Sequence, residues 1–231
     1  MGRGKKGRVV GKNQIKPERL ERDKRKYGQE LKQLKRDEMV KQAKIPFREG
    51  QGVGKIIKTT IVETPLGEMI AGATDDGLCI LEFAGREKGN AGLNDLTKLL
   101  KSSSKVGENK YLKTLRKQLK EYFAGERKEF TVPLIMPGTE FQQSVWRELI
   151  KVPFGSTKSY LEQAIAIKKP RSVRAVANVN GMNRISIIIP CHRIIGSDGS
   201  LTGYGGGLER KKWLLEHEKK YSGKAVEMSL F

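Results

Sequence analysis

Residues 159–195 read SYLEQAIAIKKPRSVRAVANVNGMNRISIIIPCHRII, a run that passes from helical spacing into an apolar segment and ends around a Cys-His-Arg triplet. Residues 159–167 and 172–180 each have the spacing of a short helix, with Lys-Lys-Pro at 168–170 between them. Two short helices joined by such a turn predict a helix-turn-helix, whose second helix usually meets DNA. Any helical hairpin looks similar, so this pattern alone does not establish DNA binding.

The Cys-His-Arg triplet is the candidate chemical centre. An apolar strand is predicted over residues 187–189, and it stops at Pro190 immediately before Cys191. A thiolate is a strong nucleophile, and an adjacent imidazole such as that of His192 can take its proton. A buried structural cysteine beside a surface histidine would leave the same pattern, and spacing alone does not separate the two interpretations.

A glycine-rich segment, GSDGSLTGYGGG at residues 196–207, follows the triplet. So many glycines indicate a tight loop or a close approach of the backbone to a ligand, and the GxxxxGK[ST] pattern of a phosphate-binding loop is absent. Residues 208–218 return to helical spacing and end in His217 and Glu218. This helix can bring one of these two side chains back to Cys191, and the spacing leaves open which one.

Upstream of the helix-turn-helix, Thr139 is placed to cap a helix that runs through Lys151. A further helix is predicted over residues 109–124. Three β-prone runs come before both helices, at residues 55–63, 67–74 and 78–84. The predicted fold class is therefore α+β: a small N-terminal α/β domain with a short β-sheet, then a mostly helical, winged-helix-like domain that contains the helix-turn-helix.

The predicted domain boundaries follow from these changes of pattern. They are a basic N-terminal extension at 1–54, partly helical or disordered, an α/β domain at 55–136, a helical domain at 137–222 and a tail at 223–231. The extension includes a charged helix predicted over residues 17–44, for which a solvated face and a contact with the DNA backbone are equally good interpretations.

The charge of the chain points to a polyanionic partner. Lys and Arg number 46 against 26 Asp and Glu, a formal net charge of +20. A field this strong attracts phosphate, so nucleic acid is favoured over a merely solvated basic surface. No predicted helix has an aromatic-rich apolar face, which argues against a membrane as the partner.

Cysteine content and hydropathy indicate an intracellular protein. No apolar run approaches the ~20 residues that span a bilayer, and the first residues have no signal-peptide core. Cys79 and Cys191 are the only cysteines, so a disulfide framework is absent, and two cysteines with two histidines make a structural zinc site improbable. Cys79 falls inside the third β-prone run, which indicates a small core residue.

These motifs together resemble the O6-alkylguanine-DNA alkyltransferase family, also called methylated-DNA–protein-cysteine methyltransferases. The resemblance covers roughly residues 55–220. It rests on five motifs in the expected order: GTEFQQSVW at 138–146, FGSTKSY at 154–160, RAV at 174–176, PCHR at 190–193 and GYGGG…KKWLLEHE from 203 to 218. The resemblance implies DNA repair by irreversible, single-turnover transfer of an alkyl group from O6-alkylguanine, with O4-alkylthymine as a further substrate, to Cys191.

The resemblance also implies roles for individual residues. Cys191 corresponds to the alkyl acceptor, His192 to the residue that draws the thiol proton through a water, and Glu218 to the carboxylate that orients the imidazole. Asn183 corresponds to the residue that holds the reactive turn against the helix-turn-helix. Tyr160 corresponds to the tyrosine that helps to rotate the nucleotide and to protonate the guanine leaving group.

The remaining site residues implied by the resemblance form two groups. Arg174 corresponds to the arginine that enters the minor groove and fills the space of the flipped base. The expected DNA contacts are Lys169, Arg171, Ser172, Arg174, Ala175 and Tyr160, and the expected substrate pocket comprises Pro190, Ile194, Tyr204, Gly205 and Gly206.

The resemblance implies no cofactor and no metal. The implied partner is double-stranded DNA that contains O6-alkylguanine, bound by a monomer without a membrane, in the nucleus of a eukaryote or the cytoplasm of a prokaryote. Physical chemistry agrees with the flipping step, because a stacked base cannot present its O6 carbon to a thiolate.

The chain departs from the family pattern at two positions. Arg184 stands where the family often has proline after the hinge asparagine, and this removes one backbone constraint. Gly205 stands where the family often has Ser or Ala, so a hydroxyl contact is missing and we expect a more mobile loop. The range of alkyl groups is therefore not set by the resemblance.

Two other functions compete with alkyl transfer. A relative that binds alkylated DNA without repairing it commonly has the acceptor cysteine replaced, and Cys191 is intact here. An unrelated Cys-His hydrolase would turn over repeatedly on an acyl substrate, and it would leave the helix-turn-helix and the +20 charge without a purpose.

Overall fold

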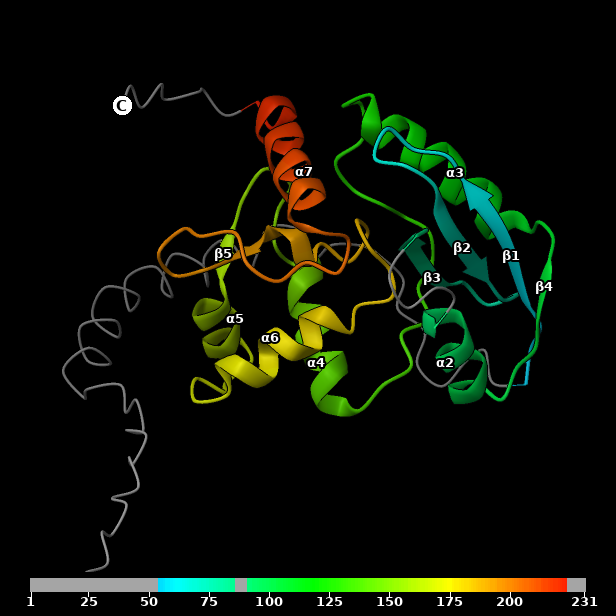
Figure 1. The fold of residues 1–231 in the computed structure, drawn as a ribbon, viewed down its shortest axis with the longest axis horizontal. Helices are drawn as coiled ribbons and strands as arrows, with labels where there is room; N and C mark the ends of the chain where they lie inside the picture. The colour runs from blue at the N-terminus through cyan, green and yellow to red at the C-terminus, as the bar shows by residue number, and fades with distance from the viewer. Residues whose placement is uncertain (1–53, 86–90, 224–231) are drawn as a thin grey trace, which may run out of the picture. The chain divides into compact units, whose positions relative to one another are not determined.

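The computed structural model describes residues 54–85 and 91–223, all within one unit, Ala43–Phe231. The helix predicted over residues 17–44 lies outside the described residues. Four strands form a sheet in the order β3-β2-β1-β4 (Figure 1). They are β1 (Ile57–Val62), β2 (Met69–Ala73), β3 (Leu78–Phe83) and β4 (Ser104–Val106). The first three lie within the three predicted β-prone runs and form an antiparallel meander, and β4 adds in parallel to β1.

Two helices pack on this sheet. α3 (Lys110–Phe123) begins where Asn109 Oδ1 accepts hydrogen bonds from the backbone N–H groups of Tyr111 and Leu112, and it covers one face (Figure 1). The helix predicted over residues 109–124 is thus confirmed. α2 (Ala91–Leu99) packs beneath the opposite face and was not predicted, because a glycine and an asparagine in its first turn are poor helix formers.

Cys79 lies in an irregularity of the sheet. Ala73 pairs with Leu78 and Gly72 with Ile80, so Cys79 is the extra residue of a β-bulge. Its thiol is buried and donates to the carbonyl of Gly72 at 3.2 Å, and burial raises its pKa to about 12. The prediction that Cys79 is a core residue is confirmed.

The helical half contains α4 (Glu140–Ile150), α5 (Tyr160–Ala166), α6 (Val173–Gly181) and α7 (Leu208–Tyr221). The two helices of the predicted helix-turn-helix, α5 and α6, start and stop within one residue of the predicted limits. Thr139 and Ser159 each cap a helix through a capping box, so local chemistry sets both N-termini.

Long-range polar contacts hold the helices α4, α5 and α6 together. Gln163 on α5 and Asn180 on α6 exchange two buried hydrogen bonds, of 3.2 and 2.7 Å. The indole N–H of Trp146 on α4 donates to the carbonyl of Val179 on α6 at 3.0 Å. Buried polar groups satisfied in this way set one arrangement of α4, α5 and α6.

The edge of strand β3 joins the two halves. Leu78 forms a bridge with Leu134, and Leu81 forms another with Ile185. The N–H of Leu81 donates to the carbonyl of Arg184, and the N–H of Ser186 donates to the carbonyl of Leu81, both at 2.8 Å. These bonds hold the chain beside Arg184, where the family's proline is missing.

The prediction of a strand over residues 187–189 is wrong. The segment is buried, but it is a pair of tight turns: Ile188 N–H donates to Ser186 O and Cys191 N–H donates to Ile189 O, both at 2.8 Å. The central residue of the first turn, Ile187, has φ of 71°. Three consecutive isoleucines signal burial, and burial alone does not distinguish a strand from a buried turn.

Candidate active site

The reactive triplet forms a short 3-10 helix, Cys191–Arg193, and all three residues are buried. Directly after it, β6 (Ile194–Ile195) pairs in parallel with β5 (Lys158–Ser159). The register Ser159↔Ile195 therefore brings the start of α5, with Tyr160, beside the triplet. This two-stranded pairing joins two of the sequence motifs.

Backbone strain marks the approach to Cys191. A positive φ is unfavourable for a β-branched residue such as Ile187, at a cost of about 1–3 kcal/mol. The two consecutive turns aim the chain so that Cys191 follows Pro190 directly, at φ −83° and ψ 61° for the proline. Strain of this kind concentrates at functional sites, where the surrounding structure maintains it.

Asn183 holds the two turns in place through both the Nδ2 and the Oδ1 of its side-chain amide. Its Nδ2 donates to the carbonyl of Ile189 at 2.8 Å and to Cys191 Sγ at 3.1 Å, and its Oδ1 accepts from the N–H of Ile185 at 2.9 Å. The side chain is buried. Asn183 thus fixes the backbone on both sides of the strained segment and points a donor at the sulfur.

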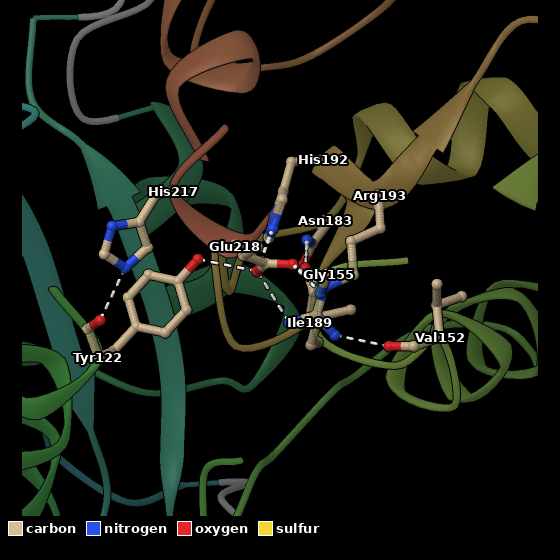
Figure 2. A network of polar contacts seen from close by, with 9 residues as sticks. All are labelled: Tyr122, Val152, Gly155, Asn183, Ile189, His192, Arg193, His217 and Glu218. Atoms are coloured by element: carbon tan, nitrogen blue, oxygen red, sulfur yellow. Dashed lines mark hydrogen bonds and ion pairs between the residues drawn. The ribbon is translucent and has the colours of Figure 1, made fainter. Parts of the chain in front are cut away.

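Glu218 is the centre of a buried polar network (Figure 2). Its Oε1 accepts from Tyr122 Oη–H at 2.8 Å, His192 Nε2–H at 2.9 Å and Arg193 Nη2–H at 2.9 Å. Its Oε2 accepts from Arg193 Nε–H at 2.8 Å and from the Gly155 N–H at 3.1 Å. The carboxylate therefore receives five hydrogen bonds from three segments, namely α3, the loop at Gly155 and the triplet, and it joins them to α7.

The charges in this network are settled by burial and pairing. Burial alone would raise the pKa of Glu218, but the contacts with His192 and Arg193 outweigh it and lower the pKa below its usual range. Burial lowers the pKa of His192, and Glu218 only partly opposes this effect. At neutral pH the site therefore holds an ionised Glu218 and a neutral His192 beside the guanidinium of Arg193.

The proton on the imidazole is placed by the same contacts. Because a carboxylate only accepts hydrogen bonds, His192 donates through Nε2, and Nδ1 keeps its lone pair. Nδ1 is buried and hydrogen-bonds no protein atom among the described residues. The imidazole of the residue next to Cys191 thus retains one nitrogen able to accept a proton.

Two residues of this network were missed at the level of sequence. Arg193 belongs to the PCHR motif, yet no role was predicted for it, and Tyr122 falls within the helix predicted over residues 109–124 without a predicted role. Arg193 also donates to the carbonyl of Val152 at 2.6 Å. An arginine inside an apolar run is a signal of a buried ion pair, whereas nothing local distinguishes Tyr122 from a core aromatic.

The choice between His217 and Glu218 is settled by the turn of α7. His217 Nε2 contacts the carbonyl of Tyr122 at 2.8 Å, and its ring stacks on Trp213 with centroids 4.9 Å apart. His217 therefore packs from α7 against α3, and Figure 2 shows its contact with Tyr122. Glu218 is the one that reaches the triplet.

Three of the predicted pocket residues, Pro190, Ile194 and Tyr204, lie beside the triplet. The ring of Tyr204 lies edge-on to that of His192, with centroids 6.3 Å apart, and Pro190 and Ile194 are the buried neighbours of the triplet. Gly206 is buried, and a Cβ there would come within 2.6 Å of Tyr204 and 2.8 Å of Phe83. Gly205, by contrast, is exposed.

Tyr160 and Lys211 bind the loop that carries Tyr204. Tyr160 Oη–H donates to the carbonyls of Thr202 and Gly203, at 3.1 and 3.3 Å. Burial raises its pKa, although the bond to Thr202 opposes the shift, so the phenol stays protonated at neutral pH. Lys211 donates to Ile194 O at 2.5 Å and Thr202 O at 2.6 Å. Burial lowers the pKa of Lys211 to about 8, with the nearby Cys191 opposing.

Five of the six predicted DNA contacts lie together at the turn and the start of α6, whereas Tyr160 is at the start of α5. Four of them are exposed and Ser172 is half-buried: the exposed residues are Lys169, Arg171, Arg174 and Ala175. The N–H of Ser172 donates to the carbonyl of Lys169, which closes the turn between the two helices. The first turn of α6 is thus presented with its cations at the surface.

Within residues 54–85 and 91–223, no group of three or more His, Cys, Asp or Glu side chains is arranged to hold a metal ion. None of the helices in these ranges has the length and apolar character needed to cross a bilayer.

The chain matches two family models that cover most of it. Residues 57–136 match "6-O-methylguanine DNA methyltransferase, ribonuclease-like domain" and residues 140–220 match "6-O-methylguanine DNA methyltransferase, DNA binding domain". Curated relatives named methylated-DNA–protein-cysteine methyltransferase include one from Methanosarcina barkeri, 40% identical over 159 residues, which are 69% of this chain and 95% of the relative. A constitutive enzyme of that name from Bacillus subtilis is 41% identical over 161 residues, 69% of this chain and 94% of the relative.

A solved structure has the same fold. The crystal structure of Mycobacterium tuberculosis OGT in complex with DNA matches with a TM-score of 0.61 and 38% identity, over 72% of this chain and 94% of that one. Three findings agree: the two domain models match in order, the relatives are about 40% identical over nearly their whole length, and Cys191, His192 and Glu218 lie together in a buried site. The chain therefore belongs to the methylated-DNA–protein-cysteine methyltransferase family.

Proposed function

We propose that this protein repairs double-stranded DNA by transferring the alkyl group of O6-alkylguanine to its own Cys191, once per molecule. The observation that carries the proposal is the Cys191–His192–Glu218 arrangement, in which a buried, ionised Glu218 accepts from His192 Nε2 at 2.9 Å. The family membership and the DNA-bound relative support the same activity.

The proposed step begins with a proton transfer. His192 Nδ1 takes the proton of the Cys191 thiol through one water, and the amide of Asn183 stabilises the resulting thiolate through its 3.1 Å contact with Sγ. Glu218 stabilises the imidazolium that forms, because their contact is buried and screened little by water.

Displacement at carbon completes the step. The sulfur forms a bond to the alkyl carbon as the bond from that carbon to O6 breaks, and the electron pair passes into the guanine ring. A proton returns to the guanine, for which the protonated phenol of Tyr160 is the proposed donor. The products are unmodified guanine and a thioether on Cys191. A thioether has no ready route back to a thiol, so the protein acts once.

Access to the O6 carbon requires that the nucleotide leave the base stack. We propose that the exposed cations at the start of α6 bind the DNA backbone and that Arg174 enters the minor groove to fill the gap. O4-alkylthymine is a second proposed substrate, since it presents an alkylated exocyclic oxygen in the same way. A monomer supplies every proposed group. Action on chromosomal DNA places the protein in the nucleus of a eukaryote or the cytoplasm of a prokaryote.

A stoichiometric transfer assay tests this function. Duplex DNA bearing O6-methylguanine labelled in its methyl group should transfer one label per protein molecule, with unmodified guanine left in the DNA. Label should stop accumulating at equimolar protein and lesion. Continued turnover, or tight binding with no gain in protein mass, would contradict the proposal.

A second test concerns base flipping. Arg174→Ala should slow transfer from duplex DNA by about tenfold or more, because the arginine offsets part of the few kcal/mol needed to extrude a base. Transfer from O6-benzylguanine as a free base needs no extrusion and should be unchanged. Arg147→Ala, an exposed arginine on α4, is the matched control. Equal slowing on both substrates would assign Arg174 to the integrity of the site instead of to flipping.

A further inference from the structure

The pocket loop, residues 202–207, is anchored at both ends. At its start, Lys211 and Tyr160 donate hydrogen bonds to the carbonyl of Thr202, and Tyr160 also donates to that of Gly203. At the other end, Arg210 Nη1 donates to the carbonyl of Gly206 at 2.9 Å. Tyr204 lies between the two anchors and faces His192.

The second anchor reaches across to the N-terminal domain. Arg210 Nε donates to the carbonyl of Leu66 at 2.8 Å, and its guanidinium lies 4.6 Å from the centroid of the Phe83 ring. Leu66 is in the turn between β1 and β2, and Phe83 ends β3. One side chain of α7 thus bonds the pocket loop and two separate parts of the sheet.

Local hydrogen bonds hold the turn that contains Leu66. Thr64 Oγ1 accepts from the N–H of Leu66 and donates to the carbonyl of Gly67, at 3.2 and 2.6 Å, and the N–H of Gly67 donates to the carbonyl of Thr64 at 2.9 Å. The planar guanidinium can bridge two carbonyls while it stacks on a ring, which a lysine cannot do. The contacts of Arg210 therefore fix the position of the pocket loop relative to the sheet.

The loop needs such an anchor because of its glycines. Gly203 and Gly207 have φ of 51° and 92°, and neither Gly205 nor Gly206 has a side chain that could pack. Phe83 lies directly beneath Gly206, where even a Cβ would clash. The hydrogen bond from Arg210 to the carbonyl of Gly206 joins this far end of the loop to α7 and opposes an outward shift of Tyr204.

We propose that Arg210 is a positioning residue that sets the range of alkyl groups accepted at Cys191, by anchoring the pocket loop to the N-terminal domain. This inference rests on the proposed alkyl transfer. A firmly placed Tyr204 holds a small alkyl group against the sulfur and leaves little room for a large one. Releasing the loop lowers the rate for methyl and relaxes the restriction on a bulky group.

The test compares two lesions in one duplex sequence, O6-methylguanine and O6-benzylguanine, on wild-type protein, Arg210→Ala and Arg210→Lys. We expect Arg210→Ala to raise the benzyl-to-methyl ratio of rate constants by about tenfold, the scale on which pocket contacts discriminate. Arg210→Lys should restore part of the wild-type ratio, because it keeps the charge and one donor. Lys212→Ala, an exposed cation one position along α7, should leave the ratio unchanged.

Hydrogen exchange supplies a readout that does not depend on activity. The amide of Gly207, which donates to Tyr204 O at 3.0 Å, should exchange faster in Arg210→Ala than in Lys212→Ala. Unchanged exchange, or two rate constants that fall in parallel, would overturn the proposal while the alkyl transfer stands. A wild-type protein that transfers neither group would reject the function itself, and the proposal with it.

Discussion

Cys191→Ser should take up no alkyl group from O6-methylguanine DNA while it keeps its affinity for the duplex. A serine hydroxyl is a far weaker nucleophile than a thiolate, and a neutral imidazole does not ionise it. The substitution is nearly isosteric, and the hydroxyl can still accept from Asn183 Nδ2. Loss of transfer would therefore report the chemistry of the sulfur and not a collapse of the turns. Intact-protein mass spectrometry after incubation with the lesion gives the measurement.

The second cysteine provides the control for this experiment. Cys79 is sealed in the bulge of β3, and its pKa of about 12 keeps the thiol protonated. Cys79→Ala should gain one alkyl group per molecule, as the wild type does, even if it is less stable. Alkyl uptake by Cys191→Ser, or its loss in Cys79→Ala, would mean that the acceptor has been assigned to the wrong residue.

Glu218→Gln should both destabilise the protein and slow alkyl transfer. The substitution leaves the charge of Arg193 buried without its partner, and breaking a buried pair in this way costs about 3–5 kcal/mol. For a domain of this size, each kcal/mol lowers the melting temperature by about 2–4 °C. An amide also cannot stabilise the imidazolium of His192, so transfer should slow by roughly 10²–10⁴-fold. Glu216→Gln, on the exposed face of the same helix, should change neither quantity.

The destabilisation should depend on pH in a defined direction. Because the folded-state pKa of Glu218 is lowered, its stabilising contribution is complete above the unfolded-state value and is lost as the pH falls towards the folded one. The difference in unfolding free energy between wild type and Glu218→Gln should therefore shrink below about pH 4.5, the ordinary range for a glutamate. A difference that is constant from neutral to acid pH would show that Glu218 is not ionised in the folded protein.

Local signals account for most of what could be predicted. Thr139, Ser159 and Asn109 each cap a helix by accepting a hydrogen bond from a backbone N–H two or three residues away. Because the two partners lie so close in the sequence, these helix N-termini can be predicted from it. The same is true of the turn between α5 and α6. The alternation of the β-prone runs likewise depends on immediate neighbours, and three strands were recovered from it.

The roles assigned to single residues came from a different source. Cys191, His192, Glu218, Asn183 and Tyr160 were assigned by resemblance, because spacing left a structural cysteine and two choices on α7 open. The structure brings these five residues around one turn, and their chemical roles stay predictions for the experiments above. The extension predicted over residues 1–54 lies outside the described residues except for Gly54.

The composition and local pattern of the chain were enough to indicate a basic, helix-turn-helix protein with a cysteine and a histidine directly after a buried segment, because charge, caps and periodicity act over a few residues. The folded chain alone revealed that Ile187 turns at positive φ, that Arg193 and Tyr122 complete the ring of donors around Glu218, and that Arg210 bonds the pocket loop to the sheet. Those contacts join segments as far as 144 residues apart. No local pattern encodes them, since they exist only once the sheet, the turns and α7 have packed against one another.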